Sequence, residues 1–217
     1  MIFIENKRSK IENLKKKHPN AYIMDMTSKA REPYVKFSPF YPHGNIPIPF
    51  TENVFGQSVE GIWQGLKVFE SEGIDPSKFE NATMKRLKRT VKTYGKVLGH
   101  QKGVHAKELL GYLDARLHIY LPTYRYVLDN NLSELVIKLK QAHAEKDLVF
   151  LDYESNCVIG NLSQPLSHAY LIKCHIENKY PEERNYLSID NIFIADTALE
   201  KPSRKSQKKA IQTKLTL

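Results

Sequence analysis

The chain has 217 residues, enough for one sizeable hydrophobic core or for one domain with appendages. Its 33 Lys and Arg residues exceed its 24 Asp and Glu residues, and the net charge of +9 favours a polyanionic partner, nucleic acid above all. Mean hydropathy is -0.48 and no apolar run reaches the roughly 20 residues needed to cross a bilayer, so the composition excludes an integral membrane protein.

The start of the chain, MIFIENKRSK, holds too short an apolar stretch for a signal peptide, so we expect a cytoplasmic protein. Its two cysteines, Cys157 and Cys174, are expected to be free, partly buried thiols. No CxxC or Cys/His ligand spacing occurs, so we expect neither a metal site nor a cofactor.

The first part of the chain predicts short strands followed by a proline-rich loop. Residues 1–4 and 21–26 are apolar enough for strands, and the basic segment IENLKKK between them predicts one or two helical turns. Residues 33–57 contain prolines that exclude a helix, because each proline removes a backbone donor and restricts the residue before it. A short hairpin around residues 46–54 is expected within this loop.

A helix with a clear beginning is predicted over residues 58–72. Ser58 is a good N-cap and Gly73 closes the helix. Apolar residues recur at helical spacing and should face the core: Val59, Ile62, Trp63, Leu66 and Phe69. A polar stripe lies beside them: Glu60, Gln64 and Lys67. A carboxylate therefore sits in the first helical turn, next to the only Trp and directly after an aromatic loop.

Basic residues dominate the next segment, since residues 81–107 contain eight Lys and Arg residues and no acid. Asp75 as N-cap and Pro76 in the first turn predict a helix that carries residues as far as Tyr94 inward. The sequence YGKVLGHQKGVH then offers several backbone amides to an anion. It is either a phosphate-binding loop or a connector between helices.

The remainder predicts helices around one buried strand. Helices are expected over residues 104–120, from Pro122 onward, over 133–145, and after Ser163 and Pro165, with a last strand at 186–194. Together the elements predict a single α+β domain, predominantly helical with a small β-sheet, over residues 1–199. Residues 200–217 have the composition of a basic, flexible tail.

The strand LVFLDYESNC begins at Leu148 as a continuous apolar run, which indicates a buried strand, and it ends in polar residues. Polar side chains at the end of a buried strand commonly form a site, because a rigid element holds them beside a crevice. Asp152 and Glu154 alternate, so both would face one side of the strand. Alternatively, such acids only bind neighbouring backbone amides.

The loop and the helix after it resemble a known family. Ser38-Pro39-Phe40-Tyr41-Pro42, followed by a helix that opens Ser58-Val59-Glu60-Gly61 and continues through Gln64 and Lys67, looks like the signature of the NADAR-type N-glycosidases. Pro39 stands where the family pattern has Asn, Gly61 stands where it has His, and the family's later Trp-Gly-x-Gly element is not found. The resemblance implies cleavage of a sugar–nitrogen bond and chemistry on ADP-ribose.

Hydrolysis of an N-glycosidic bond needs a carboxylate near C1′, a donor for the departing group and an aromatic wall for a flat base. The candidate catalytic acids are Glu60, Asp152 and Glu154; an acid in a first helical turn can also simply complement the helix dipole. The candidate base-binding residues are Phe40, Tyr41, Asn45, Trp63, Gln64, Tyr153 and Asn156. The candidate phosphate contacts are Lys67, Arg89, Lys96 and Arg116.

These observations predict an N-glycosidase acting on nucleic acid, most simply a DNA glycosylase that excises a base and leaves an abasic site. The first alternative is a NADAR-type hydrolase of ADP-ribose or ADP-ribosylated bases, with a nucleotide-like small molecule as its partner. The second is a nucleic-acid-binding protein without catalytic activity, which would need the basic segments but not Glu60.

Overall fold

Three parallel strands form the main sheet in the computed structural model, which describes residues 1–182 of the chain. The strands are β1 (Ile2–Asn6), β8 (Leu148–Asp152) and β2 (Tyr22–Asp25), in the order β1-β8-β2. All five residues of β8 are buried, which confirms the prediction from its continuous apolar run. Because the strands are parallel, their polar carboxyl ends meet at one edge of the sheet.

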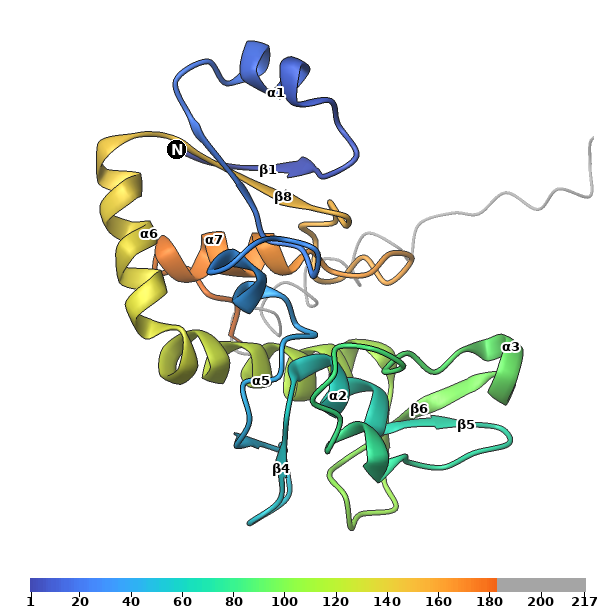
Figure 1. The fold of residues 1–217 in the computed structure, drawn as a ribbon. Coiled ribbons are helices and arrows are strands. Elements are labelled where there is room, and N and C mark those ends of the chain that lie inside the picture. Colours follow the sequence, from blue (N-terminus) through green and yellow to red (C-terminus); the bar gives the residue numbers. More distant parts are fainter. Residues whose placement is uncertain (183–217) are drawn as a thin grey trace, which may run out of the picture. The chain divides into compact units, whose positions relative to one another are not determined.

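Helices cover the sheet and extend away from it (Figure 1). Helix α1 (Ile11–Lys17) packs Leu14 against Val149 and Leu151. Helix α7 (His168–Ile176) contacts β8 and β1, and α6 (Ser133–Glu145) contacts α7. The bounds of α6 agree with the helix predicted over 133–145.

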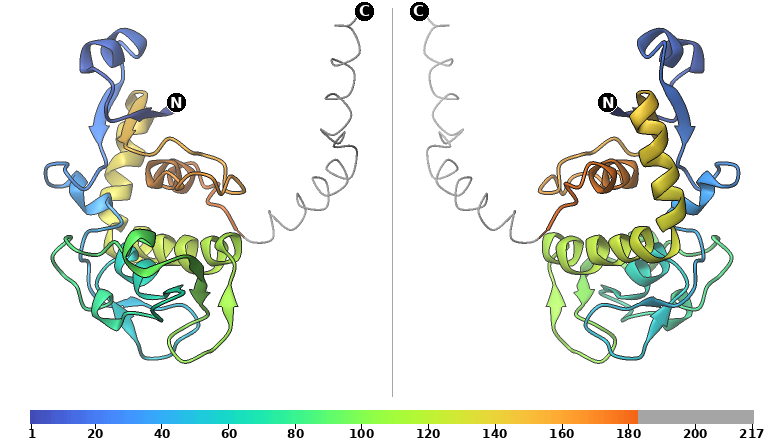
Figure 2. Two further views of the ribbon diagram at one scale, coloured as in Figure 1. Left: turned by 90° about the vertical axis from the view of Figure 1, so that its right-hand side faces the viewer. Right: turned by 90° about the vertical axis from the view of Figure 1, so that its left-hand side faces the viewer.

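Four consecutive helical segments form a long helical row, which connects the main sheet to the rest of the domain. It comprises α4 (Tyr112–Ala115), η3 (Arg116–Tyr120), α5 (Leu121–Tyr126) and η4 (Val127–Asn131), of which η3 and η4 are wide π-type turns. Both views in Figure 2 show α7 lying between this row and the strands β1 and β8.

The predicted break of this row at Pro122 is wrong, because the helix continues through the proline. The wide turn η3 ends two residues before Pro122 and accommodates the missing backbone donor, as insertions of this kind do in kinked helices. Thr123 Oγ1 donates to the carbonyl oxygen of Ile119 at 2.5 Å and stabilises the same turn. The row also begins later than predicted, at Tyr112.

A second, antiparallel sheet replaces helix at two places where helix was expected. Its strands are β5 (Lys67–Phe69), β6 (Val97–Gln101) and β7 (Leu109–Leu110), in the order β5-β6-β7. Helix α2 (Val59–Gly65) therefore ends before Lys67, which pairs with His100 of β6 instead of continuing the helix. Strand β6 lies within the segment proposed as a phosphate-binding loop or connector.

The helix predicted after Asp75 is reduced to two short turns, η2 (Pro76–Lys78) and α3 (Val91–Tyr94). Between them Met84 and Arg86 adopt positive φ angles of 57° and 56°, a backbone conformation that no right-handed helix contains.

The proline-rich loop has the expected irregular form. It contains the turn η1 (Tyr34–Phe37) and a small hairpin of β3 (Ile46–Pro47) and β4 (Phe55–Gly56), close to the predicted hairpin around 46–54. The fold is thus a predominantly helical α+β domain, as predicted. The strand expected at 186–194 and the tail expected at 200–217 lie outside the described residues. Within residues 1–182, no helix is both long and apolar enough to span a bilayer.

Gly65 is the last residue of α2, and its α-carbon lies against the ring of Phe79, where a β-carbon would collide with three ring atoms. We expect Gly65→Ala to lower the free energy of unfolding by about 1–3 kcal/mol, because Phe79 is buried and must shift. Gly73→Ala is the matched control, since a β-carbon there meets nothing within 4 Å and should change stability by less than about 0.5 kcal/mol. Urea denaturation of the two variants compares them directly; equal stabilities would contradict the packing argument.

Candidate functional site

A cavity of about 550 Å³ collects side chains from segments that are far apart in the sequence. The proline-rich loop, α2, the segment before α3, the row from α4 to η3, the end of β8 and the start of α7 all contribute to its lining. Most of the predicted site residues lie in this lining: Glu60, Asp152, Glu154, Phe40, Trp63, Gln64, Tyr153, Lys67, Arg89 and Arg116.

Four predicted residues are not part of the cavity lining. Tyr41 contacts the ring of His43, with the ring centroids 4.9 Å apart. Asn45 and Lys96 are exposed elsewhere. Asn156 is buried and uses its side chain to hold its own loop, donating to the carbonyl oxygens of Asn161 and Gln164 and accepting from a backbone amide.

Glu60 is held by both the helix and the loop that carry the family resemblance. Ser58 caps α2, with its Oγ accepting from the amide of Gly61 at 3.0 Å. The amide of Glu60 donates to the carbonyl oxygen of Pro39 at 2.8 Å, which ties the start of the helix to the loop. The position where the family pattern has His is filled here by Gly61, where a β-carbon would collide with the carbonyl oxygen of Lys78. No side chain fits there.

Gln64 orients the carboxylate of Glu60. Gln64 Oε1 accepts from the backbone amide of Arg89 at 3.1 Å, so its Nε2 must face the other way, and it donates to Glu60 Oε1 at 2.9 Å. Glu60 Oε2 has no hydrogen-bond donor among residues 1–182 and is available to a ligand.

Burial raises the pKa of Glu60, although the amide of Gln64 and the ammonium groups of Lys67 and Lys88 oppose the shift. Burial likewise lowers the pKa of Lys67, and the charge of Glu60 opposes that shift. The hydrogen bond from Gln64 and the charge of Lys67 thus favour the ionised form of Glu60, and the charge of Glu60 favours the ionised form of Lys67.

Two lysines in the cavity lie over aromatic rings. Lys67 Nζ is 5.8 Å from the ring centre of Trp63, and Lys88 Nζ is 5.7 Å from that of Phe40. Neither ammonium group forms a hydrogen bond or a salt bridge with another described residue, so both can bind an anion. The ring of Trp63 lies against the buried ring of His100, with ring centres 3.8 Å apart and planes tilted by 33°, and burial lowers the pKa of His100 to about 3, so His100 is uncharged.

Asp152 lies in the cavity lining, but its carboxylate is engaged by the start of α7. Its Oδ2 accepts from Ser167 Oγ at 2.8 Å and from the amide of Ala169 at 3.3 Å, and lies 3.0 Å from His168 Nδ1. His168 Nε2 donates to the carbonyl oxygen of Met26 at 2.8 Å, so both ring nitrogens face acceptors. This arrangement favours the charged imidazolium.

Electrostatics agree with that geometry. Burial alone would raise the pKa of Asp152, but the charge and hydrogen bonds of His168, with Ser167, lower it to about 2. Burial would lower the pKa of His168, but Asp152 raises it. The carboxylate of Asp152 and the ring of His168 thus hold together the ends of β8 and β2 and the start of α7 at the cavity, and the catalytic role of Asp152 stays a prediction. Glu154 is exposed at the mouth of the cavity.

Both predicted phosphate-binding arginines donate to backbone carbonyl oxygens. Arg89 binds those of Lys67 at 2.5 Å and Gly73 at 2.7 Å. Arg116 binds those of Ile159 at 2.5 Å, Asn161 at 3.0 Å and Gln164 at 3.1 Å. The two guanidinium groups thus hold backbone segments in the walls of the cavity, whereas the ammonium groups of Lys67 and Lys88 have no hydrogen-bond or salt-bridge partner among the described residues.

The sequence interpretation did not select Lys88, Tyr112 or Tyr120, which also line the cavity. A signal for the tyrosines existed, because residues 112, 116 and 120 are four apart and fall on one face of a helix. Residues 1–182 contain no group of three or more His, Cys, Asp or Glu residues that could hold a metal ion. Both thiols are free, and Cys174 is buried.

The fold and the site define an α+β protein with a cavity lined by the carboxylate of Glu60, by aromatic side chains and by two lysines that have no hydrogen-bond or salt-bridge partner among the described residues. The chain belongs to a family of unknown function (DUF6939), which matches residues 6–172. The matched range includes every residue of the cavity lining. A comparison with curated proteins gave no match.

Proposed function

We propose that this protein is an N-glycosidase that hydrolyses the bond between a sugar carbon C1′ and a nitrogen in a nucleotide unit. The observation that carries the proposal is that five residues of the NADAR-like signature line one cavity, although they come from different elements: Ser38, Phe40, Glu60, Gln64 and Lys67. A volume of about 550 Å³ falls in the range of cavities that bind small molecules.

In the proposed chemistry, Glu60 acts at C1′, the sugar carbon whose bond to nitrogen breaks. The C1′–N bond breaks and its electron pair leaves with the nitrogen, so positive charge develops at C1′ and the ring oxygen. The carboxylate of Glu60, oriented by Gln64, stabilises this cation and accepts a proton from the water whose oxygen adds to C1′. Because the cavity is partly shielded from solvent, this electrostatic stabilisation is stronger than in bulk water.

The proposed binding uses the aromatic and cationic walls. A flat base can stack on Trp63 or Phe40, and the ammonium groups of Lys67 and Lys88 can bind the phosphates of the same nucleotide.

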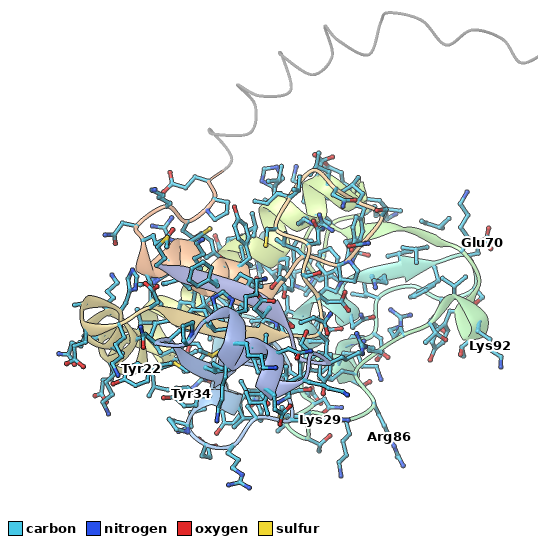
Figure 3. The ribbon with its side chains drawn as sticks, turned by 90° about the horizontal axis from the view of Figure 1, so that it is seen from above. Tyr22, Lys29, Tyr34, Glu70, Arg86 and Lys92 are labelled. Carbon is cyan, nitrogen blue, oxygen red and sulfur yellow. The ribbon has the colours of Figure 1, made fainter. Side chains whose placement is uncertain are left out.

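Two substrate versions follow, and different observations favour them. The net charge of +9 favours a polynucleotide, and thus a DNA glycosylase that flips a base into the cavity. Two exposed cations also lie within two positions, along the sequence, of residues in the cavity lining. They are Lys29 and Arg86, and Figure 3 shows their side chains pointing outward. The NADAR-like signature favours release of ADP-ribose from a base or from a free nucleotide.

A substrate panel separates these versions. Single- and double-stranded oligonucleotides are incubated with the protein and treated with alkali, while NAD and ADP-ribosylated oligonucleotides are assayed for released ADP-ribose. Alkali-labile sites would support the glycosylase version, and free ADP-ribose the other. Tight, salt-sensitive DNA binding without any product would contradict the proposal and indicate a binding protein without catalytic activity.

The two lysines provide a separate prediction. We expect Lys67→Met and Lys88→Met each to weaken binding of nucleoside 5′-phosphates about tenfold, because each removes one unpaired ammonium group, and to flatten its salt dependence. Lys92→Met is the control, since Lys92 lies in the same basic segment but outside the cavity lining and points to solvent (Figure 3). Calorimetry with AMP and with adenosine measures the effect. If the variants lose as much affinity for adenosine, which lacks the phosphate, as for AMP, the lysines do not bind the phosphate.

A further inference from the structure

Three tyrosines pack together in the helical part of the fold; Tyr124 and Tyr180 are buried and use their hydroxyl groups in the fold, whereas Tyr120 is half-buried. Tyr124 Oη donates to the carbonyl oxygen of Phe37 at 2.6 Å, and Tyr180 Oη donates to that of Leu121 at 2.9 Å. The hydroxyl of Tyr120 has no hydrogen-bond partner among residues 1–182. It is not sealed in the core either, because Tyr120 lines the cavity and this oxygen is not among the buried unpaired ones.

The ring of Tyr120 is fixed beside the aromatic wall. It stacks on Tyr124, with ring centres 6.3 Å apart and planes 10° apart, and meets Trp63 edge-on at 5.7 Å and 78°. Its position on the wide turn η3, which contacts α2, places it on the same side as Trp63. A base held by the aromatic wall of the cavity would therefore lie next to this phenol.

The phenol keeps its proton. Burial raises the pKa of Tyr120 well above its ordinary value, and the carboxylates of Glu60 and Asp152 raise it further. A group that is always protonated can donate a hydrogen bond at any physiological pH. Tyr120 and Glu60 both line the cavity, so the hydroxyl and the carboxylate can contact one ligand.

We propose that the Tyr120 hydroxyl is a catalytic group that donates a hydrogen bond to an acceptor atom on the departing base while Glu60 acts at C1′. The inference rests on the proposed function. As the C1′–N bond breaks, its electron pair moves onto the base, and a donor aimed at the base edge stabilises that charge. No proton is transferred, so the base leaves with its electrons and is protonated by water.

Tyr120→Phe removes only the hydroxyl and retains the stacking ring. It is compared with Tyr124→Phe, which removes a hydroxyl used by the fold, and with Glu60→Gln. One substrate is the oligonucleotide or nucleotide that the panel above shows to be cleaved. The other is 4-nitrophenyl ribofuranoside 5-phosphate, whose nitrophenolate leaves without assistance.

We expect Tyr120→Phe to lower kcat/KM about 10- to 100-fold for the base-bearing substrate but less than about threefold for the nitrophenyl compound. Glu60→Gln should lower both, and Tyr124→Phe should lower stability without changing the ratio of the two rates. Equal losses on both substrates, or none, for Tyr120→Phe would overturn the inference while leaving the proposed function intact.

Binding supplies a second readout that does not depend on turnover. Calorimetry with AMP, GMP, CMP and UMP should show weaker binding by Tyr120→Phe for the nucleotides that bind, with the affinity for ribose 5-phosphate unchanged. If the wild-type protein cleaves nothing, the proposed function fails, and this measurement alone judges Tyr120 as a contact to the base. Unchanged nucleotide affinity, or no nucleotide binding by the wild-type protein, would overturn the inference.

Discussion

Glu60→Gln should lower turnover about a thousandfold or more and leave the fold intact. The proposed role requires a carboxylate beside C1′, and general acid–base groups of this kind contribute up to about 10⁴ in rate. Glutamine has nearly the same shape and can still accept from Gln64 Nε2, which donates to Glu60 Oε1. Stability should stay equal or rise slightly, because the cavity disfavours the charge of the native side chain.

Glu134→Gln is the matched control for this variant. Glu134 also lies in the first turn of a helix, α6, but it is exposed and outside the cavity lining. The wild-type pH profile provides a further check. Because the pKa of Glu60 is raised above 4.5 and the ionised form is required, kcat/KM should fall as pH decreases through a value above 4.5. Full activity of Glu60→Gln would remove this residue from the mechanism.

Asp152→Asn should lower the free energy of unfolding by about 3 kcal/mol near pH 6, because it leaves a buried imidazolium without its counter-charge. Asp129→Asn is the matched control. Asp129 lies 2.7 Å from His175 Nε2 in a pair of the same type, but its carboxylate is about half exposed, so the cost should stay below about 1 kcal/mol. Chemical denaturation of both variants tests the difference.

The loss should depend on pH in a defined direction. The lowered pKa of Asp152 gives stability that is present above its unfolded value of 3.8 and disappears as pH falls toward about 2. The raised pKa of His168 gives stability that is present below its unfolded value of 6.5 and disappears as pH rises through the folded value. The difference between wild type and Asp152→Asn should therefore be greatest between pH 3.8 and 6.5. A difference that does not vary with pH would contradict the ion pair.

The elements that the sequence predicted well are those whose pattern is local. The apolar run of β8 and the amphipathic pattern of α6 are complete within their own residues, and both elements lie where they were expected. The N-cap Ser58 likewise marks the start of α2. The end of α2 was not predictable, because Lys67–Phe69 continues the helical spacing but pairs with a strand about thirty residues away.

The sequence predicted which residues belong to the candidate site better than it predicted what each of them does. Glu60 and Asp152 were both candidate catalytic acids, but only the structure shows that Asp152 binds the start of α7 whereas Glu60 has one oxygen without a described partner. The two arginines illustrate the same limit. A guanidinium group can bind a phosphate or a backbone carbonyl, and the loop that gives Arg116 its partners takes shape only when the chain folds.

The central proposal, that water attacks a sugar carbon under the control of Glu60, is tested most directly by hydrolysis in ¹⁸O-labelled water. The substrate is the one cleaved in the panel, and mass spectrometry locates the label in the products of the wild-type protein and of Glu60→Gln. We expect the label at C1′ of the released sugar with the wild-type protein, and no labelled product with the variant. A label on phosphate, or an equal yield of labelled sugar from both proteins, would contradict the proposal.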